Sequence, residues 1–519
     1  LWLRLAREQA DAGFPRAAAA SIEHAKRLQD GVTVDPSLTL TLPPRAVWPV
    51  NPPLIESQHE RNHDVHQLRV PLDLDTSDFF RDLDVSVDRQ NRKVLFTSGE
   101  HRRSWDLPLT KSSSNLRFVP QLLMGWGRGR VLLLRVGSEL FAIAPFDERD
   151  EPVARILWTV DMLAGSMVLA DHARSENLPM IPGVREEDVR LVSAFGRTLA
   201  QVGPVRAGFV CYHEKGKLVS LDTFTGRKRW ERFDLPFDAR SFGDEQHVLV
   251  LSPRRKSVDV LRAIDGQLLE TRVWDGHPDR LVLLQETRAY QILPQTGGWQ
   301  LRCEDVATGR VIWSHDAPAG ATPVVLDDKV IAVAEPSGKL QFLSVDDGRQ
   351  LAEPVTFPAM PQLERALVSR DADTWYVVLS NRLSRPAALQ PANNLTSHRT
   401  PVVDGPLLAI DRRTFATRWQ QTLTRAPWLL DQPRTAPVLL HAYRLGTPHQ
   451  IANGFTNSVI RLLDKQTGAE VLQREGANLL GFATFQSDVD RGLVEVRLEP
   501  ETIRLRYYPH PPAPASPEP

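Results

Sequence analysis

Two stretches of this chain repeat one pattern, Asp222-Thr-Phe-Thr-Gly-Arg-Lys-Arg-Trp230 and Asp305-Val-Ala-Thr-Gly-Arg-Val-Ile-Trp313. Aspartate, threonine, glycine, the arginine after it and tryptophan stand at the same offsets in both stretches. Weaker copies of the pattern surround Gly266, Gly348, Asp464 with Gly468, and Asp411 with Trp419. Such internal repetition at a near-constant period indicates a repeat architecture.

The spacing of the glycines gives the size of the repeating unit. From Gly226 to Gly266 is 40 residues, from Gly266 to Gly309 is 43, and from Gly309 to Gly348 is 39. Short β-branched runs alternate with turn signals about every ten residues, which favours an all-β sandwich or propeller. A period of about 40 residues is typical of one four-stranded propeller blade. The sequence therefore predicts a β-propeller.

Each residue of the motif has a structural interpretation. The glycine permits a left-handed turn between two outer strands. The aspartate accepts backbone N–H bonds inside that turn. The tryptophan packs between neighbouring blades, where its indole N–H needs a backbone acceptor. We favour this packing role over the alternative, in which the tryptophans stack on a ligand.

The run from Leu221 to Trp230 and the copy from Asp305 to Trp313 resemble the PQQ-like repeat with its tryptophan docking motif. That repeat occurs in quinoprotein dehydrogenases and in non-enzymatic propellers, including the lipoprotein of the β-barrel assembly machinery. The resemblance covers roughly Leu68 to Tyr508. It implies a ring of roughly seven or eight four-stranded blades, with eight favoured. Asn478 to Tyr508 is expected to form a closing strand pair with the N-terminal segment.

The rest of the chain divides into flanking segments. Residues 1–31 are predicted to form a helical hairpin, which is either the end of a tetratricopeptide-like array or a plain hairpin. Residues 32–67 are interpreted as a Pro-rich linker, residues 68–508 as the PQQ-like propeller and residues 509–519 as a disordered Pro-rich tail. Because the chain starts at Leu1, we expect it to be part of a longer bacterial protein.

Composition excludes several classes of function. With 63 basic and 64 acidic residues, the formal net charge is −1, which does not favour binding to nucleic acid. No apolar run reaches the roughly 18 residues that span a bilayer. The two cysteines, Cys211 and Cys303, fall in separate blades and cannot make a cysteine-rich zinc module.

Catalytic chemistry finds little support in the residues. The quinoprotein dehydrogenases that this chain resembles hold the quinone beneath adjacent cysteines and over a calcium ion, but this sequence has no Cys-Cys pair. We therefore predict no cofactor and no catalytic residues. The run His59-Glu-Arg-Asn-His63, followed by His66, matches a zinc-protease pattern. Its polar surroundings favour a solvated linker, so these histidines are only weak metal candidates.

The sequence thus favours a non-catalytic propeller scaffold with a protein partner. One alternative is a quinone-dependent oxidoreductase or another enzyme that uses the propeller channel. The other is an extracytoplasmic ligand-sensing domain. The family resemblance implies a periplasmic or cell-envelope location in a bacterium.

Overall fold

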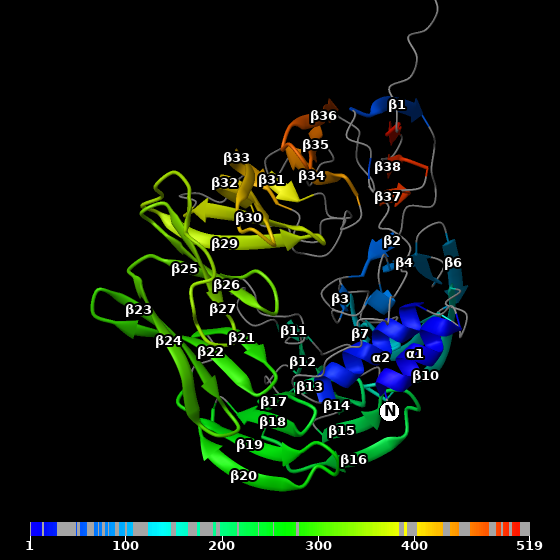
Figure 1. Cartoon of the computed structure of the whole chain (residues 1–519), viewed down its shortest axis with the longest axis vertical. Coiled ribbons are helices and arrows are strands. Elements are labelled where there is room, and N and C mark those ends of the chain that lie inside the picture. Colours follow the sequence, from blue (N-terminus) through cyan, green and yellow to red (C-terminus); the bar gives the residue numbers. More distant parts are fainter. Residues whose placement is uncertain are drawn as a thin grey trace, which may run out of the picture. The chain divides into compact units, whose positions relative to one another are not determined.

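The computed structural model divides the chain into two compact units (Figure 1). Unit 1 comprises Leu1–Leu42 and Val70–Pro354, and unit 2 comprises Pro43–Arg69 and Val355–Pro519. The structure describes residues 2–12, 15–28, 48, 52–59, 67–70, 72–74, 78–80, 83–88, 93–98, 101–106, 123–146, 152–164, 174–176, 190–193, 198–214, 217–236, 238–252, 254–276, 280–382, 389–391, 402–428, 436–445, 457–476, 484–488, 491–497 and 501–508.

Two helices open unit 1, as the sequence predicts. Helix α1 covers Trp2–Asp11 and α2 covers Pro15–Leu28. Pro15 occupies the first position of α2, where its missing N–H costs no hydrogen bond. Neither described helix is long and apolar enough to cross a membrane.

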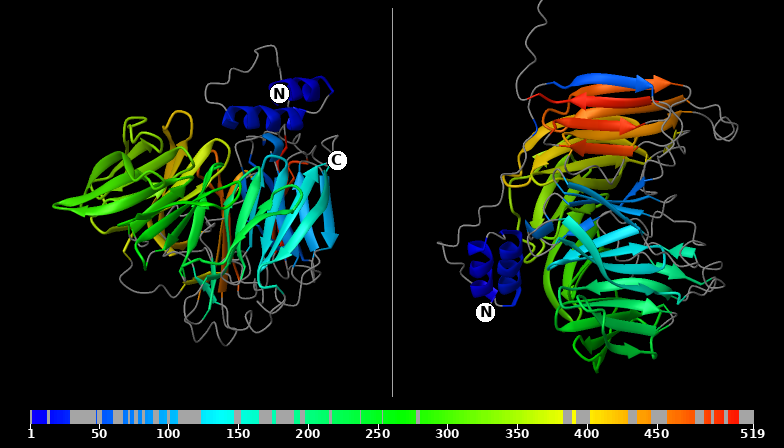
Figure 2. Two further views of the ribbon diagram at one scale, coloured as in Figure 1. Left: turned by 90° about the horizontal axis from the view of Figure 1, so that it is seen from below. Right: turned by 90° about the vertical axis from the view of Figure 1, so that its right-hand side faces the viewer.

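The helical hairpin has its own small core and a firm attachment within unit 1. Ala6, Ala18 and Ile22 form a buried cluster between the two helices, which lie side by side (Figure 2). Arg16 donates a hydrogen bond of 3.3 Å to the carbonyl of Phe79 in the short helix η1 (Asp78–Phe80). Its guanidinium also lies 4.8 Å from the ring centroid of Phe146. The hairpin is therefore anchored by one arginine to unit 1.

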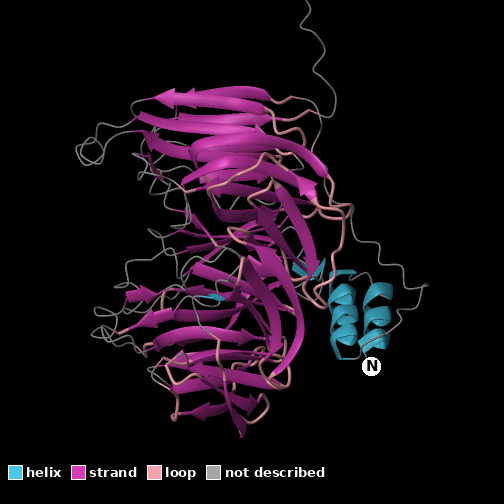
Figure 3. Cartoon of the chain, turned by 90° about the vertical axis from the view of Figure 1, so that its left-hand side faces the viewer, coloured by secondary structure: helices cyan, strands magenta, loops and turns pink. Residues whose placement is uncertain are grey.

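The rest of unit 1 is built of strands (Figure 3). Its sheets are antiparallel apart from one parallel pair of strands, and their strands otherwise follow the chain order. The first sheet contains β4 (Leu83–Asp88), β5 (Lys93–Ser98) and β6 (His101–Asp106). The second contains β7 (Leu123–Arg128), β8 (Val131–Val136), β9 (Glu139–Phe146), β10 (Pro152–Asp161) and β3 (Leu72–Leu74), which runs parallel to β7. The third contains β11 (Arg174–Glu176), β12 (Arg190–Val192), β13 (Thr198–Val205), β14 (Phe209–Glu214), β15 (Lys217–Asp222) and β16 (Lys228–Arg232).

The next three sheets of unit 1 have the same layout. One sheet contains β17 (Arg240–Gly243), β18 (His247–Ser252), β19 (Ser257–Arg262) and β20 (Leu268–Val273). The next contains β21 (Leu281–Gln285), β22 (Arg288–Gln295), β23 (Gly298–Asp305) and β24 (Arg310–Pro318). The third contains β25 (Thr322–Val325), β26 (Val330–Glu335) and β27 (Lys339–Ser344). The short strands β2 (Gln67–Arg69) and β28 (Val355–Thr356) stand where the chain passes between the two units.

Unit 2 contains three four-stranded sheets. The first contains β29 (Leu363–Arg370), β30 (Thr374–Asn381), β32 (Val402–Asp411) and β33 (Thr417–Pro427). The second contains β31 (Leu389–Pro391), β34 (Val438–Leu445), β35 (Asn457–Asp464) and β36 (Glu470–Gly476). The third contains β1 (Leu54–His59), β39 (Glu501–Arg506), β38 (Leu493–Arg497) and β37 (Thr484–Asp488).

Strand β1 comes from the segment whose prolines predict a linker. It pairs antiparallel with β39, with Leu54 opposite Arg506 and His59 opposite Glu501. Pro52 and Pro53 stand just before the strand, where a missing N–H breaks no ladder bond. Among its described residues, the segment 32–67 therefore contains strand β1 and the first residue of β2. Strand β1 shares a sheet with the C-terminal strands, as the expected closing pair requires.

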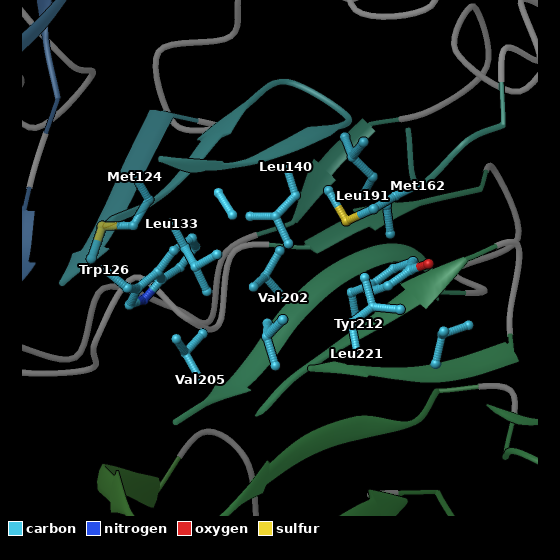
Figure 4. Close-up of a cluster of buried hydrophobic side chains, with 14 of the residues drawn as sticks. Met124, Trp126, Leu133, Leu140, Met162, Leu191, Val202, Val205, Tyr212 and Leu221 are labelled. Carbon is cyan, nitrogen blue, oxygen red and sulfur yellow. The ribbon is translucent and has the colours of Figure 1, made fainter. Parts of the chain in front are cut away.

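The core lies between the faces of successive sheets. Figure 4 shows Met124, Trp126, Leu133 and Leu140 facing Val202, Val205, Tyr212 and Leu221, which belong to the β13–β16 strands. Strands buried on both faces carry continuous apolar runs, such as β8 and β26. The all-β class and the repeated antiparallel sheets are confirmed. The described residues form nine sheets, and the number of blades in a closed ring stays a prediction.

Candidate functional site: the seams between sheets

The motif aspartates hold the turns between the last two strands of each sheet. Asp222 Oδ1 accepts hydrogen bonds from the backbone N–H of Phe224 (3.2 Å) and Thr225 (2.8 Å) and from the Thr225 hydroxyl (2.9 Å). Its Oδ2 pairs with Arg229 Nη2 at 2.9 Å. Burial alone would raise the pKa of Asp222, but these hydrogen bonds and Arg229 outweigh it and hold the pKa below its ordinary value.

The same arrangement recurs at the other copies of the motif. Asp305, Asp411 and Asp464 each accept the N–H groups of the residues two and three positions later. At Asp411, Arg418 Nη2 lies 2.5 Å from Oδ2 and keeps the pKa of the carboxyl well below its usual range. These carboxylates are committed to their own turns, so they are poor candidates for acid–base chemistry.

Each motif tryptophan donates its indole N–H to the following sheet. Trp230 Nε1 lies 2.8 Å from the carbonyl oxygen of Ala263, and Trp158 Nε1 lies 2.9 Å from that of Thr223. The pairs Trp313 with Val345 and Trp419 with Lys465 are also 2.9 Å long. Every acceptor stands three residues before a glycine of the repeat. The same hydrogen-bond geometry therefore occurs at four seams, a seam being the contact between one sheet and the next.

The glycines are required by space as well as by backbone conformation. A Cβ on Gly266, where φ is +70°, would lie 2.6 Å from the indole of Trp230. The same contact would be 2.5 Å between Gly226 and Trp158, and 2.7 Å at the Gly348 and Gly468 seams. The indole therefore lies flat against a turn that has no side chain at that point.

One seam is built differently. In the sheet of β17–β20, Glu270 occupies the position that tryptophan takes after the glycine in other copies. Arg272 replaces the indole, because its Nη1 donates to the carbonyl of Thr308 at 2.6 Å and lies 3.2 Å from a Cβ placed on Gly309. Glu270 Oε2 pairs with Arg272 Nη2 at 2.6 Å. The motif alone predicts neither the replacement of the tryptophan by Arg272 nor the contact of Trp158 with the next sheet.

The histidines of the zinc-protease pattern are not on a helix where the structure describes them. His59 ends strand β1 opposite Glu501, whereas His63 and His66 lie outside the described residues. Among the described residues, no group of three histidine, cysteine or carboxylate side chains is placed to hold a metal ion.

A buried serine–histidine contact joins β14 and β17. His213 Nε2 lies 3.2 Å from Ser241 Oγ, and the Ser241 hydroxyl donates to the carbonyl of Gly203. A serine nucleophile must give its proton to the base. Because this hydroxyl proton is given to a carbonyl, the contact links two sheets rather than activating a nucleophile.

The two cysteines are also held in an unreactive form. Burial raises the pKa of the Cys211 thiol to about 12 and that of the Cys303 thiol to about 11. The thiolate is the nucleophilic species, so both side chains behave as small apolar groups of the core.

Comparison with known proteins agrees with the repeat geometry. Residues 258–443 match the family model PQQ_2, described as outer membrane protein assembly factor BamB. No curated protein matches the chain in sequence.

Solved structures that match the chain include BamB from Moraxella catarrhalis, with 13% identity, 76% of this chain and 96% of that chain covered, and a TM-score of 0.32. The computationally designed Ika8 protein has 9% identity, coverages of 87% and 100%, and a TM-score of 0.35. The C-terminal WD40 domain of Sif2 has 8% identity, coverages of 73% and 93%, and a TM-score of 0.34. The sequence match shows that residues 258–443 of this β-protein carry PQQ-like repeats similar to those of BamB.

Proposed function

We propose that this chain is a non-catalytic bacterial propeller scaffold that binds a protein partner. The observation that carries the proposal is the distribution of exposed large apolar side chains. Seven of the nine among the described residues lie between residues 224 and 311: Phe224, Phe233, Ile264, Leu268, Leu269, Val273 and Val311. They lie on or next to β16, β20 and β24, the outer strands of three successive sheets. Exposed apolar patches are typical of protein interaction surfaces.

The polar residues of the repeat support the same conclusion. The motif carboxylates bond to their own turns, and the indole N–H groups bond to backbone carbonyls of the next sheet. The motif therefore builds the scaffold and leaves recognition to the outer surface. Similarity of residues 258–443 to the BamB family supports a periplasmic or cell-envelope location.

A pair of crosslinking variants tests the proposal. A photoreactive amino acid replaces Ile264, which is 70% exposed in the apolar region, or Gln473, which is exposed on β36. After illumination in the envelope fraction of the source bacterium, we expect a discrete crosslinked species from position 264 and none from position 473. Equal crosslinking at both positions would contradict the proposal.

A ligand titration separates the scaffold from the enzyme. Pyrroloquinoline quinone with calcium is added to the purified chain while heat release and melting temperature are followed. A scaffold gives no saturable heat. A ligand present at a hundredfold over its Kd stabilises the folded state by about 2.7 kcal/mol, so a rise of that size in the free energy of unfolding would identify a quinone-dependent enzyme.

A further inference from the structure

Strand β20 differs from the other outer strands in its side chains. The corresponding strand β16 carries Lys228, Arg229, Glu231 and Arg232, and charged outer strands of this kind discourage pairing with other chains. On β20, Leu268, Leu269 and Val273 are exposed instead. The strand lies at the margin of unit 1 (Figure 1). It is therefore an outer edge with fewer charged side chains and more exposed apolar side chains than β16.

The backbone of β20 offers unpaired groups along that edge. The strand is last in its sheet, and its inner neighbour is β19. The N–H of Trp274 donates to the carbonyl of Lys256 at 2.8 Å, and Ser257 lies opposite Val273. Because hydrogen-bonded and non-hydrogen-bonded pairs alternate in an antiparallel ladder, the N–H and C=O groups of Thr271 and Val273 point away from β19. A further strand can bind to these groups.

The side chains beside those groups suit an apolar strand. Val273 is 82% exposed and Leu269 is 49% exposed. Between them, Thr271 is uncharged and its hydroxyl donates to Asp259 Oδ1 at 2.7 Å. Alternate apolar positions on an added strand would cover Leu269 and Val273, since cross-strand neighbours on one face lie in contact.

The contact of this strand with the next sheet also differs from the tryptophan seams. Where other sheets have a tryptophan docked on the next turn, β20 has Glu270, which is paired with Arg272. Leu268 remains 41% exposed at this seam. The absence of a docked tryptophan and the exposure of three apolar side chains thus coincide on one strand.

Charge at one end of β20 sets the direction of a partner. The turn that joins β18 to β19 contains Arg254, Arg255 and Lys256, and it adjoins the Val273 end of β20. Two acids lie beside these three basic residues: Asp275 follows β20, and Asp238 Oδ2 accepts the N–H of Arg254 at 2.8 Å. A strand that pairs antiparallel with β20 begins at this end, so acidic residues at its N-terminus would face the basic turn.

We propose that β20 is a docking strand, on which an extended segment of a partner protein pairs antiparallel as a fifth strand. The segment has apolar residues at alternate positions and acidic residues at its N-terminal end. This inference rests on the proposed scaffold function and names the chemistry of its partner. Backbone hydrogen bonds supply the affinity, and Leu269 and Val273 select the apolar positions.

The test uses a defined peptide and variants of the whole chain. The probe is a fluorescein-labelled peptide of two aspartates followed by alternating valine and threonine, and binding is measured by fluorescence anisotropy. Thr271→Pro removes one outward N–H without removing a β19–β20 hydrogen bond. We expect saturable binding to the unaltered chain and at least a tenfold rise in Kd for Thr271→Pro.

Matched control variants test whether the outward N–H on the edge of β20 is responsible for binding. Thr271→Ala loses the hydroxyl but keeps the N–H, and Glu231→Pro makes the same change on β16, so both are expected to bind as the unaltered chain does. Val273→Ser removes the apolar side chain without adding a charge, so it is expected to weaken binding without any change in the backbone. Moving the two aspartates to the C-terminal end of the peptide is expected to raise the Kd.

The outcomes separate this inference from the scaffold proposal. Unchanged affinity in both Thr271→Pro and Val273→Ser, each with an unaltered melting temperature, overturns strand docking. If a crosslink from position 264 persists while the peptide does not bind, the scaffold stands and the docking strand falls. If neither the crosslink nor peptide binding is observed, both fall.

Discussion

The indole nitrogen of Trp230 donates a hydrogen bond of 2.8 Å to the carbonyl oxygen of Ala263, which belongs to the next sheet. Both residues are buried, so water cannot replace the bond when it is lost. We expect Trp230→Phe to lower the free energy of unfolding by about 1–3 kcal/mol, because a buried carbonyl is left unpaired. Urea denaturation measures the change.

Trp126 supplies the control for that experiment. Its Nε1 is buried and has no hydrogen-bond partner among the described residues. Trp126→Phe removes a similar volume but no hydrogen bond, so its cost is expected to be smaller than that of Trp230→Phe. Equal costs at the two sites would show that ring volume, and not the seam bond, is what matters.

Two glycines with the same backbone conformation test how closely the indoles approach. Gly266 has φ +70° and Gly309 has φ +72°. Alanine at either position is expected to cost about 1–2 kcal/mol for the left-handed conformation. At Gly266 the added Cβ also meets Trp230 at 2.6 Å, whereas at Gly309 it meets only the flexible end of Arg272 at 3.2 Å.

We therefore expect Gly266→Ala to be more destabilising than Gly309→Ala by about 1–3 kcal/mol, the usual range for overpacking. Thermal and urea unfolding of the two variants give the comparison. If both alanines cost the same, the indole does not restrict the turn, and the seam geometry described above is incorrect.

The ion pair between Asp411 and Arg418 predicts a dependence of stability on pH. Arg418 lowers the pKa of Asp411 in the folded state. A lowered pKa contributes stability above the unfolded value of about 3.9, and this contribution is lost as the pH falls toward the folded value. Asp411→Asn keeps an acceptor for the Thr414 N–H but cannot pair with the guanidinium.

Asp411→Asn is expected to melt at a lower temperature than the unaltered chain at pH 7, and the difference should shrink as the pH falls below about 4. Differential scanning calorimetry at several pH values measures both quantities. A difference that stays constant down to pH 2 would mean that the charge of Asp411 does not contribute.

The buried thiols should report on unfolding. Since the pKa is raised to about 12 at Cys211 and to about 11 at Cys303, neither side chain forms a thiolate at pH 8. We expect no reaction with Ellman's reagent in buffer, and reaction of two thiols per chain in denaturant. Rapid reaction of either thiol in buffer would place it on an accessible surface.

The repeat motif predicted the turns correctly because local chemistry determines them. The glycines at 226, 266, 309, 348 and 468 all have φ between +68° and +73°. Phe415 replaces glycine in one copy, yet it adopts φ +60° in the same kind of turn, held by the same aspartate contacts. A side chain is therefore tolerated there, which no rule based on glycine would predict.

The sequence pattern does not predict contacts between distant segments of the chain. Arg272 reaches Thr308 because the two lie side by side in space, and nothing in the residues around Glu270 indicates a replacement for tryptophan. Trp158 docks on Gly226 although its own sheet lacks the Asp-x-x-Thr-Gly run. These pairings depend on how sheets stack, which a single repeat does not contain.

The pairing of β1 with β39 has a consequence for synthesis. A ribosome makes Leu54–His59 early and Glu501–Arg506 more than four hundred residues later, yet these segments are adjacent strands. During translation β1 has no partner while the sheets of unit 1 emerge and fold, since domains fold as they are made. The last sheet of unit 2 is therefore completed only after the C-terminal strands have left the ribosome, and until then Leu54–His59 lacks its partner strand β39.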